Sequence, residues 1–164
     1  MIQRAQTLFL LGVSVCMGMV LAYYIWGELI PEQNQVIRFS ALEMEIIDTQ
    51  GTEDYADDVV LETRATWYIA VLAILSSLVA LFSIFQYKNR LNQMKLGALN
   101  ALLMAATLGI SFYHAYQYEN ISPTTTGTYT FGFVLPAGAM ILNILANRFI
   151  RKDEKLVKSV DRIR

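Results

Sequence analysis

The stretch ATWYIAVLAILSSLVALFSIFQY, residues 65–87, contains no aspartate, glutamate, lysine or arginine over 23 positions. At a rise of 1.5 Å per residue, about 20 helical residues cross the hydrocarbon core of a bilayer. Three more uncharged runs flank it, at residues 5–27, 96–118 and 120–147. Because each backbone polar group in hydrocarbon must be satisfied within its own segment, the runs favour helices. They predict four transmembrane helices, near Gln6–Trp26, Thr66–Gln86, Leu96–Gln117 and Tyr129–Asn147.

The composition supports a membrane protein. Of 164 residues, 55% are hydrophobic and only 16% are charged, whereas a soluble domain usually carries about 25% charged residues. This excludes a disordered chain, a disulfide scaffold and a free nucleic-acid-binding domain, so no nucleic-acid partner is expected. We predict an all-α fold class: one membrane domain over residues 1–164, a four-helix bundle in the lipid bilayer. The first run is longer than a signal-peptide core and no A-x-A-like site follows it, so we expect an uncleaved anchor.

The basic residues set the expected orientation. Eleven of the 13 lysines and arginines fall on one side of the predicted spans: Arg4, Lys88, Arg90, Lys95, Arg148, Arg151, Lys152, Lys155, Lys158, Arg162 and Arg164. The positive-inside rule places this side in the cytoplasm. Both termini and the basic tail, residues 148–164, are then cytoplasmic, while the loops at 27–64 and 118–128 lie outside.

The first outer loop, residues 27–64, holds ten acidic residues against two arginines, a formal charge of −8. Within it, residues 37–40 and 42–46 alternate apolar and polar side chains, which is the period of a half-exposed strand. Residues 49–52 suit a turn, and residues 59–63 suit a returning strand. We therefore expect a small antiparallel ribbon that covers the outer ends of the helices.

Side chains able to support catalysis or to bind a metal are scarce. The acids at 53–58 lack the order of an EF-hand loop, so a solvated loop is favoured, with weak cation attraction left open. A single histidine, His114, and a single cysteine, Cys16, exclude a histidine-ligated metal site, a haem with two histidine ligands and a redox dithiol. The spans also lack the acidic or basic side chains that ion-coupled transport uses at membrane depth. We expect no enzyme, no cofactor and no metal site, and an interfacial hydrogen-bonding role for His114.

Two patterns in the spans predict helix contacts. Small residues recur every four positions in the third span, at Gly97, Ala101, Ala105 and Gly109. Such a stripe lets helix backbones approach closely, either within the bundle or against a partner protein. The notable polar residues within the spans are Asn100 and Asn143, at comparable depth. We expect their side chains to hydrogen-bond each other and hold the third and fourth spans together, a contact worth about 0.6–2 kcal/mol.

The tail, residues 148–164, places apolar side chains at helical spacing with a basic opposite face. Its charged residues follow a defined order, which suggests docking onto the cytoplasmic face of another protein. The candidate docking residues are Arg151, Lys152, Asp153, Glu154, Lys158, Asp161 and Arg162. The alternative is a topology signal on a helix that is solvated or lies along anionic lipid.

Three segments resemble a known family. They are the start Met1–Thr7, the turn Tyr87–Arg90 followed by Gln93 and Asn100, and the end Arg151–Arg164. Together they resemble a family of bacterial inner-membrane proteins of the Bacteroidetes, called domain of unknown function 4293. The resemblance covers the whole chain and implies four spans in the bacterial inner (plasma) membrane. It implies no activity and no catalytic positions.

These observations favour a non-catalytic accessory or scaffolding subunit of a bacterial inner-membrane complex, with other membrane subunits as its partners. A secretion or insertion machine and a respiratory assembly are both candidate hosts. The alternative function is a binder or carrier of a lipophilic small molecule, a lipid or a quinone, within the helix bundle. A third hypothesis is a sensor that uses the acidic outer loop.

Overall fold

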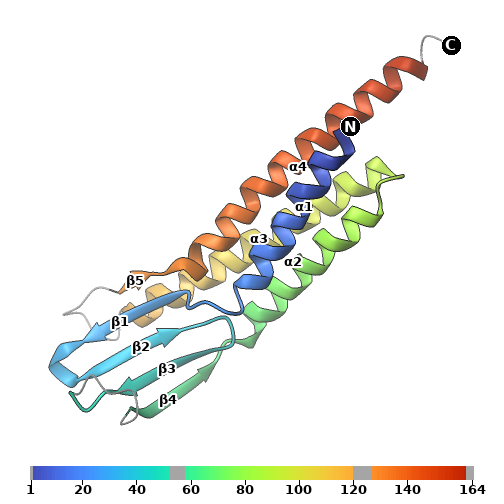
Figure 1. The fold of residues 1–164 in the computed structure, drawn as a ribbon. Coiled ribbons are helices and arrows are strands. Elements are labelled where there is room, and N and C mark those ends of the chain that lie inside the picture. Colours follow the sequence, from blue (N-terminus) through green and yellow to red (C-terminus); the bar gives the residue numbers. More distant parts are fainter. Residues whose placement is uncertain (1, 52–57, 120–126, 162–164) are drawn as a thin grey trace.

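The computed structural model describes residues 2–51, 58–119 and 127–161, and it combines a helical bundle with a β-sheet (Figure 1). The bundle consists of α1 (Ile2–Met19), α2 (Trp67–Phe85), α3 (Arg90–Glu119) and α4 (Phe131–Asp161). The sheet consists of β1 (Trp26–Ile30), β2 (Gln35–Phe39), β3 (Glu43–Asp48), β4 (Val59–Ala65) and β5 (Thr128–Tyr129). The expected four helices are therefore present, but the fold class is not all-α, because a five-stranded antiparallel sheet accompanies them.

The helices run alternately in opposite directions, and each packs against two neighbours. α1 lies against α2 and α4, and α3 lies against the same two helices. The sheet lies beyond the end of the bundle where α1 and α3 finish; we call this the sheet end (Figure 1). At the opposite end, the tail end, lie the N-terminus, the turn between α2 and α3, and the last turns of α4, which extend past the other helices (Figure 1).

Helix α2 carries large apolar side chains on its outside and mainly small or polar ones inside. The buried residues of α2 are Ile69, Ala70, Ala73, Ser76, Ala80 and Ser83. Its exposed large residues are Trp67, Val71, Ile74, Leu75, Leu78, Phe82 and Phe85. Contiguous exposed apolar surface of this kind is unusual in a protein that is surrounded by water. Among the described residues, three helical stretches are long and apolar enough to cross a membrane, as in a membrane protein: Trp67–Phe85, Arg90–Glu119 and Phe131–Val157.

The prediction for the first span is wrong at its outer end. α1 stops at Met19, its apolar part Ala5–Met19 is shorter than the other three stretches, and Trp26 begins strand β1. Aromatic and β-branched residues dominate the end of the uncharged run, and such residues favour a strand. Ile25 and Trp26 are each 1% exposed. A charge is excluded at these two positions because their side chains are buried in the protein, where a charge is costly as it is in lipid.

The predicted ribbon is present and is part of a larger sheet. The strands lie in the order β4-β3-β2-β1-β5, so the predicted returning strand β4 forms one edge. The predicted turn follows β3, where Gln50 and Gly51 adopt positive φ. Strand register places Trp26 opposite Phe39, and Phe39 opposite Met44, and all three side chains are buried. Sheet and bundle share one hydrophobic core through them.

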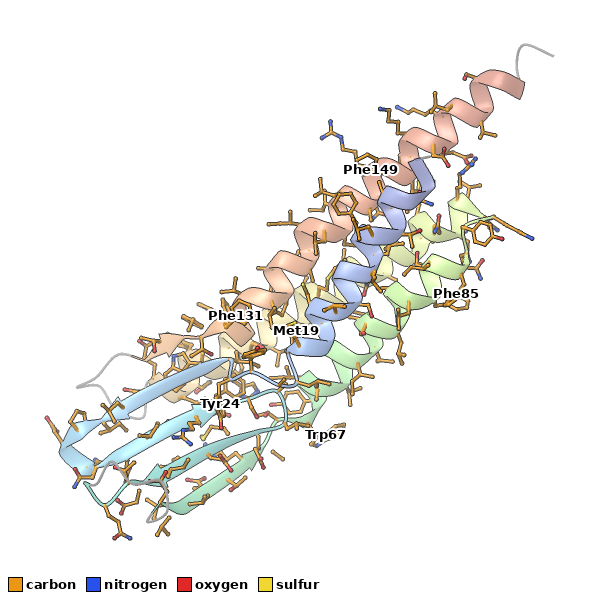
Figure 2. The ribbon with its side chains drawn as sticks, viewed as in Figure 1. Met19, Tyr24, Trp67, Phe85, Phe131 and Phe149 are labelled. Atoms are coloured by element: carbon orange, nitrogen blue, oxygen red, sulfur yellow. The ribbon has the colours of Figure 1, made fainter. Side chains whose placement is uncertain are left out.

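Close backbone contacts fix the sheet to the bundle. At the start of α4, the Gly132 N–H donates to the Tyr24 carbonyl at 3.0 Å, and the Thr130 N–H donates to the Ile25 carbonyl at 3.0 Å. A Cβ atom at Gly132 would lie 2.3 Å from the Tyr24 carbonyl oxygen, so only glycine fits at this crossing. Figure 2 shows Met19, Tyr24, Trp67 and Phe131 gathered at this junction. The sheet is therefore held directly against the helix ends.

Candidate functional site

The polar residues inside the bundle join neighbouring helices. The Ser76 hydroxyl of α2 donates to Asn100 Oδ1 at 2.6 Å, and Asn143 Nδ2 of α4 donates to the Gly97 carbonyl at 2.9 Å. The expected direct bond between Asn100 and Asn143 is replaced by these two contacts. Since α3 packs between α2 and α4, its residues 97 and 100 face different neighbours. Asn143 therefore joins α4 to α3 through a backbone carbonyl, whereas Asn100 joins α3 to α2.

Two further polar contacts were not anticipated from the sequence. Ser14 and Ser77 share a hydrogen bond of 2.8 Å between their hydroxyls, which joins α1 to α2. Gln93 Nε2 donates to the Ser83 carbonyl at 2.7 Å, which joins α3 to α2. The three serines lie within the uncharged runs, whereas Gln93 stands between Arg90 and Lys95, just before the third run. Such bonds contribute about 0.6 kcal/mol each in membrane bundles, so the interior is built for packing.

The small-residue stripe of α3 winds from the inside of the bundle to its surface. Gly97 is buried, and a Cβ atom there would lie 2.3 Å from Asn147 Oδ1 of α4. Ala101 is half-buried, whereas Ala105 and Gly109 are exposed. A spacing of four residues overshoots one helical turn by 40°, so three such steps rotate the stripe by about 120°. The first half packs within the bundle, and a partner at Ala105 and Gly109 stays a prediction.

An aromatic cleft opens at the sheet end between β4, the start of α2 and the end of α3. It measures about 510 Å³, and its lining residues are Ile46, Glu62, Arg64, Ala65, Thr66, Tyr68, Tyr113, His114, Gln117 and Tyr118. Tyr68 Oη and His114 Nε2 form a hydrogen bond, as expected for an interfacial histidine. The His114 ring also stacks on Tyr118, with 5.7 Å between ring centroids. The walls of the cleft thus combine flat apolar surface with hydrogen-bonding groups.

An exposed ion pair lies beside this cleft on β4. Arg64 Nε donates to Glu62 Oε1 at 2.6 Å, and about half of each side chain is exposed. The hydrogen bond to Glu62, together with its negative charge, raises the pKa of Arg64. The cleft therefore has one cationic and one anionic group at its sheet side, and both remain within reach of a ligand.

Strand β4 itself is an exposed sheet edge. All of its residues are exposed, and in the described part of the chain it pairs with β3 alone. Three consecutive apolar side chains, Val59, Val60 and Leu61, are 47%, 50% and 52% exposed. The register shifts between Ile46 and Ile47 of β3, which leaves Leu61 without an opposite residue. The sequence pattern predicted the strand, but its edge position depends on the order of strands in the sheet.

An ion-pair cluster links α3 to α4 at the tail end. Arg90, at the start of α3, contacts Asp153 at 2.9 Å and Glu154 at 3.9 Å on α4. These three side chains are only 15–19% exposed. Two of the acids predicted to dock onto another protein thus pair within the chain. Arg151 and Lys152 are exposed.

The remaining predicted docking residues lie near the end of α4. Lys158 and Asp161 belong to the last turns of this helix. Arg162 lies outside the described residues, as do most of the acids at 53–58. Among the residues that are described, no group of three or more histidine, cysteine, aspartate or glutamate side chains is placed to hold a metal ion.

The chain was compared with known proteins. A search of curated proteins finds no match. The model of the family described as domain of unknown function, DUF4293, matches residues 2–163. The segments that suggested this family in the sequence include Arg90, Asp153 and Glu154, which meet in the ion-pair cluster at the tail end. Because the match covers nearly the whole chain, the protein belongs to the DUF4293 family.

Proposed function

We propose that the chain is a non-catalytic accessory or scaffolding subunit of a bacterial inner-membrane complex, with four membrane spans and both termini in the cytoplasm. The apolar outside of the bundle supports its placement in lipid. α1 supports a fourth crossing, because it packs along α2 and α4, although it is shorter than they are. The basic residues of the tail end support a cytoplasmic location for that end.

The observation that carries the proposal is the exposed apolar strip on β4, formed by Val59, Val60 and Leu61. Three consecutive exposed apolar residues on a sheet edge favour aggregation unless another surface covers them. In the proposed topology the sheet lies outside the membrane, where lipid tails do not cover it. A second protein subunit is the natural occupant. The shift of register at Leu61 interrupts the edge, so we expect the partner to contact side chains more than to add a long strand.

Affinity purification tests this function. The tagged chain is extracted from its native membrane in mild detergent at native expression, and co-purifying proteins are identified by mass spectrometry. We expect one or a few membrane proteins at a fixed ratio, lost in Leu61→Lys and retained in Leu29→Lys. Leu29 is a matched control, since it is a 60% exposed leucine on β1, which β2 and β3 separate from β4. Isolation of the wild-type chain as a lone monomer contradicts the proposal.

A second candidate function is binding of a lipophilic small molecule, and the aromatic cleft favours it. The side chains of Val13, Met17 and Met104 are fully buried and fill the middle of the bundle. We therefore place the proposed binding site at the rim of the bundle, and not in its interior. There, Tyr68 and His114 offer hydrogen bonds to a polar headgroup, while an apolar chain extends along the exposed helix surface. A lipid and a quinone both combine a polar headgroup with an apolar chain.

Extraction of bound small molecules tests the second candidate. Lipids and quinones that co-purify with the wild-type chain are quantified by chromatography and mass spectrometry. A bound headgroup in the cleft predicts a stoichiometric species that is lost in His114→Gln. Leu102→Ala, at a 70% exposed position of α3 outside the cleft lining, should retain it. Equal content in both variants removes the cleft as the binding site.

A further inference from the structure

A second groove, about 510 Å³ in volume, runs along one face of α4 near the tail end. Its lining residues are Ile144, Asn147, Arg148, Arg151, Lys152 and Lys155. These positions recur at intervals of three and four, so they share a single helix face. Four of the six side chains are cationic, and none of the six is acidic. The groove therefore attracts an anion.

The nearby acids do not neutralise this groove. Asp153 and Glu154 both pair with Arg90 of α3, and neither lines the groove. Arg148, Arg151, Lys152 and Lys155 are all exposed. Among the described residues, Arg90 thus draws these two acids of α4 toward α3, while the basic side chains of the groove stay exposed. Removing the acids from the groove raises its positive potential where it opens to solvent.

The groove also spans the expected boundary between lipid and water. Arg148 is the first charged residue after the uncharged run 120–147. One turn before it lies Ile144, which is 62% exposed, and Ile141, 61% exposed, follows in the same direction along α4. An anion held at the basic part of the groove therefore has exposed apolar surface on its membrane side. A free phosphate ion gains nothing from contact with apolar surface, whereas the acyl chain of a lipid packs against it.

We propose that this groove binds the headgroup of an anionic phospholipid, with its acyl chains along Ile144 and Ile141. Arg148 and Arg151 suit the phosphodiester, because guanidinium groups pair with phosphate oxygens through two parallel hydrogen bonds. Lys152 and Lys155 lie further from the membrane and supply positive charge to the remaining headgroup. Basic pockets on the cytoplasmic side of membrane helices hold anionic lipids in this manner. The inference rests on the membrane placement proposed above, but not on a partner at β4.

The experiment titrates the purified full chain, in neutral detergent, with phosphatidylglycerol, phosphatidylcholine or inorganic phosphate. Bound lipid is counted by native mass spectrometry, and affinity is followed by a thermal shift. We expect one tightly held phosphatidylglycerol and at least about tenfold weaker binding of phosphatidylcholine. Equal binding of the two lipids overturns the proposal, and so does phosphate binding as tight as that of phosphatidylglycerol.

Matched variants locate the site. Lys152→Gln/Lys155→Gln removes two charges from the groove, and we expect about tenfold or greater loss of phosphatidylglycerol affinity. Lys88→Gln/Lys95→Gln removes two exposed lysines at the same end of the bundle, outside the groove lining, and should change affinity less than about twofold. Equal losses indicate diffuse charge attraction and overturn the proposed site. Leu61→Lys should leave lipid binding intact, so failure of the partner proposal and failure of this one are distinguishable.

Discussion

The two ends of the bundle are built from different chemistry. At the sheet end, backbone crosses backbone at Gly132, and aromatic rings surround His114. At the tail end, ion pairs from Arg90 link α3 to α4. Close packing tolerates little change in volume, whereas partly exposed ion pairs contribute little to stability. The comparison indicates a rigid surface at the sheet end and an adaptable, charged surface at the tail end.

The largest expected effect is at the junction of sheet and bundle. Gly132→Ala would place its Cβ atom 2.3 Å from the Tyr24 carbonyl oxygen, and backbone cannot move aside as a side chain does. We expect a loss of about 3 kcal/mol or more in stability. Thermal unfolding in detergent measures it, and limited proteolysis reports release of the sheet. Gly138→Ala, in the same helix with no atom within 4 Å of its Cβ, should be neutral or stabilising. Equal behaviour of the two variants means that the sheet is not held by this contact.

The bundle interior should respond less strongly. Gly97→Ala would bring Cβ to 2.3 Å from Asn147 Oδ1, but here a side chain can shift. We expect a loss of about 1–2 kcal/mol in thermal unfolding. The control is Gly109→Ala, further along α3, where a Cβ atom meets nothing within 4 Å. If Gly109→Ala destabilises the chain more than Gly97→Ala in detergent, the assignment of inner and outer halves of the stripe is wrong.

The tail end should respond more weakly still. A double-mutant cycle of Arg90→Gln and Asp153→Asn measures their coupling free energy, which we expect to be about 0.5–1 kcal/mol. Their distance of 2.9 Å and low exposure place the pair near the upper part of that range. Added salt should reduce the coupling only slightly, since the pair is partly buried. A coupling near zero would show that the order of charges in the tail serves another purpose.

The smallest effect is expected for the exposed pair on β4. Arg64→Gln removes the contact with Glu62, but about half of both side chains is open to solvent. We expect a change in thermal stability below about 0.5 kcal/mol, which salt screens. A larger loss would show that the cleft side of the sheet contributes to folding, contrary to its assignment as an open surface.

The helices could be predicted because charge is excluded from hydrocarbon and from protein interiors alike. For the same reason the first span was predicted to extend too far. Ile25 and Trp26 belong to the uncharged run, but they are buried in the protein and lie outside α1. Alternation of apolar and polar residues was enough to place β2 and β3, and β4 covers the residues 59–63 that were predicted as a returning strand. The strand β5 has two residues, Thr128 and Tyr129, which is too short for any periodic signal.

The candidate sites were less predictable, because they depend on how elements face one another. The sequence indicated that Asn100 and Asn143 hydrogen-bond within the bundle. Their actual partners, Ser76 and the Gly97 carbonyl, depend on how α3 is rotated toward α2 and α4. The sequence also identified the segments around Arg90 and Asp153, which lie more than 60 residues apart, without indicating that they meet. The exposed edge of β4 became visible only once the strand order was known.

Site-specific photo-crosslinking in the native cell tests the central claim, that β4 docks another membrane-complex subunit. A photoreactive amino acid is placed at Leu61 on β4, or at Leu29 on β1, which β2 and β3 separate from β4; both positions are exposed. We expect one dominant crosslinked protein from position 61 and little from position 29. Absence of a crosslink from position 61, or the same mixture of abundant proteins from both positions, would contradict it.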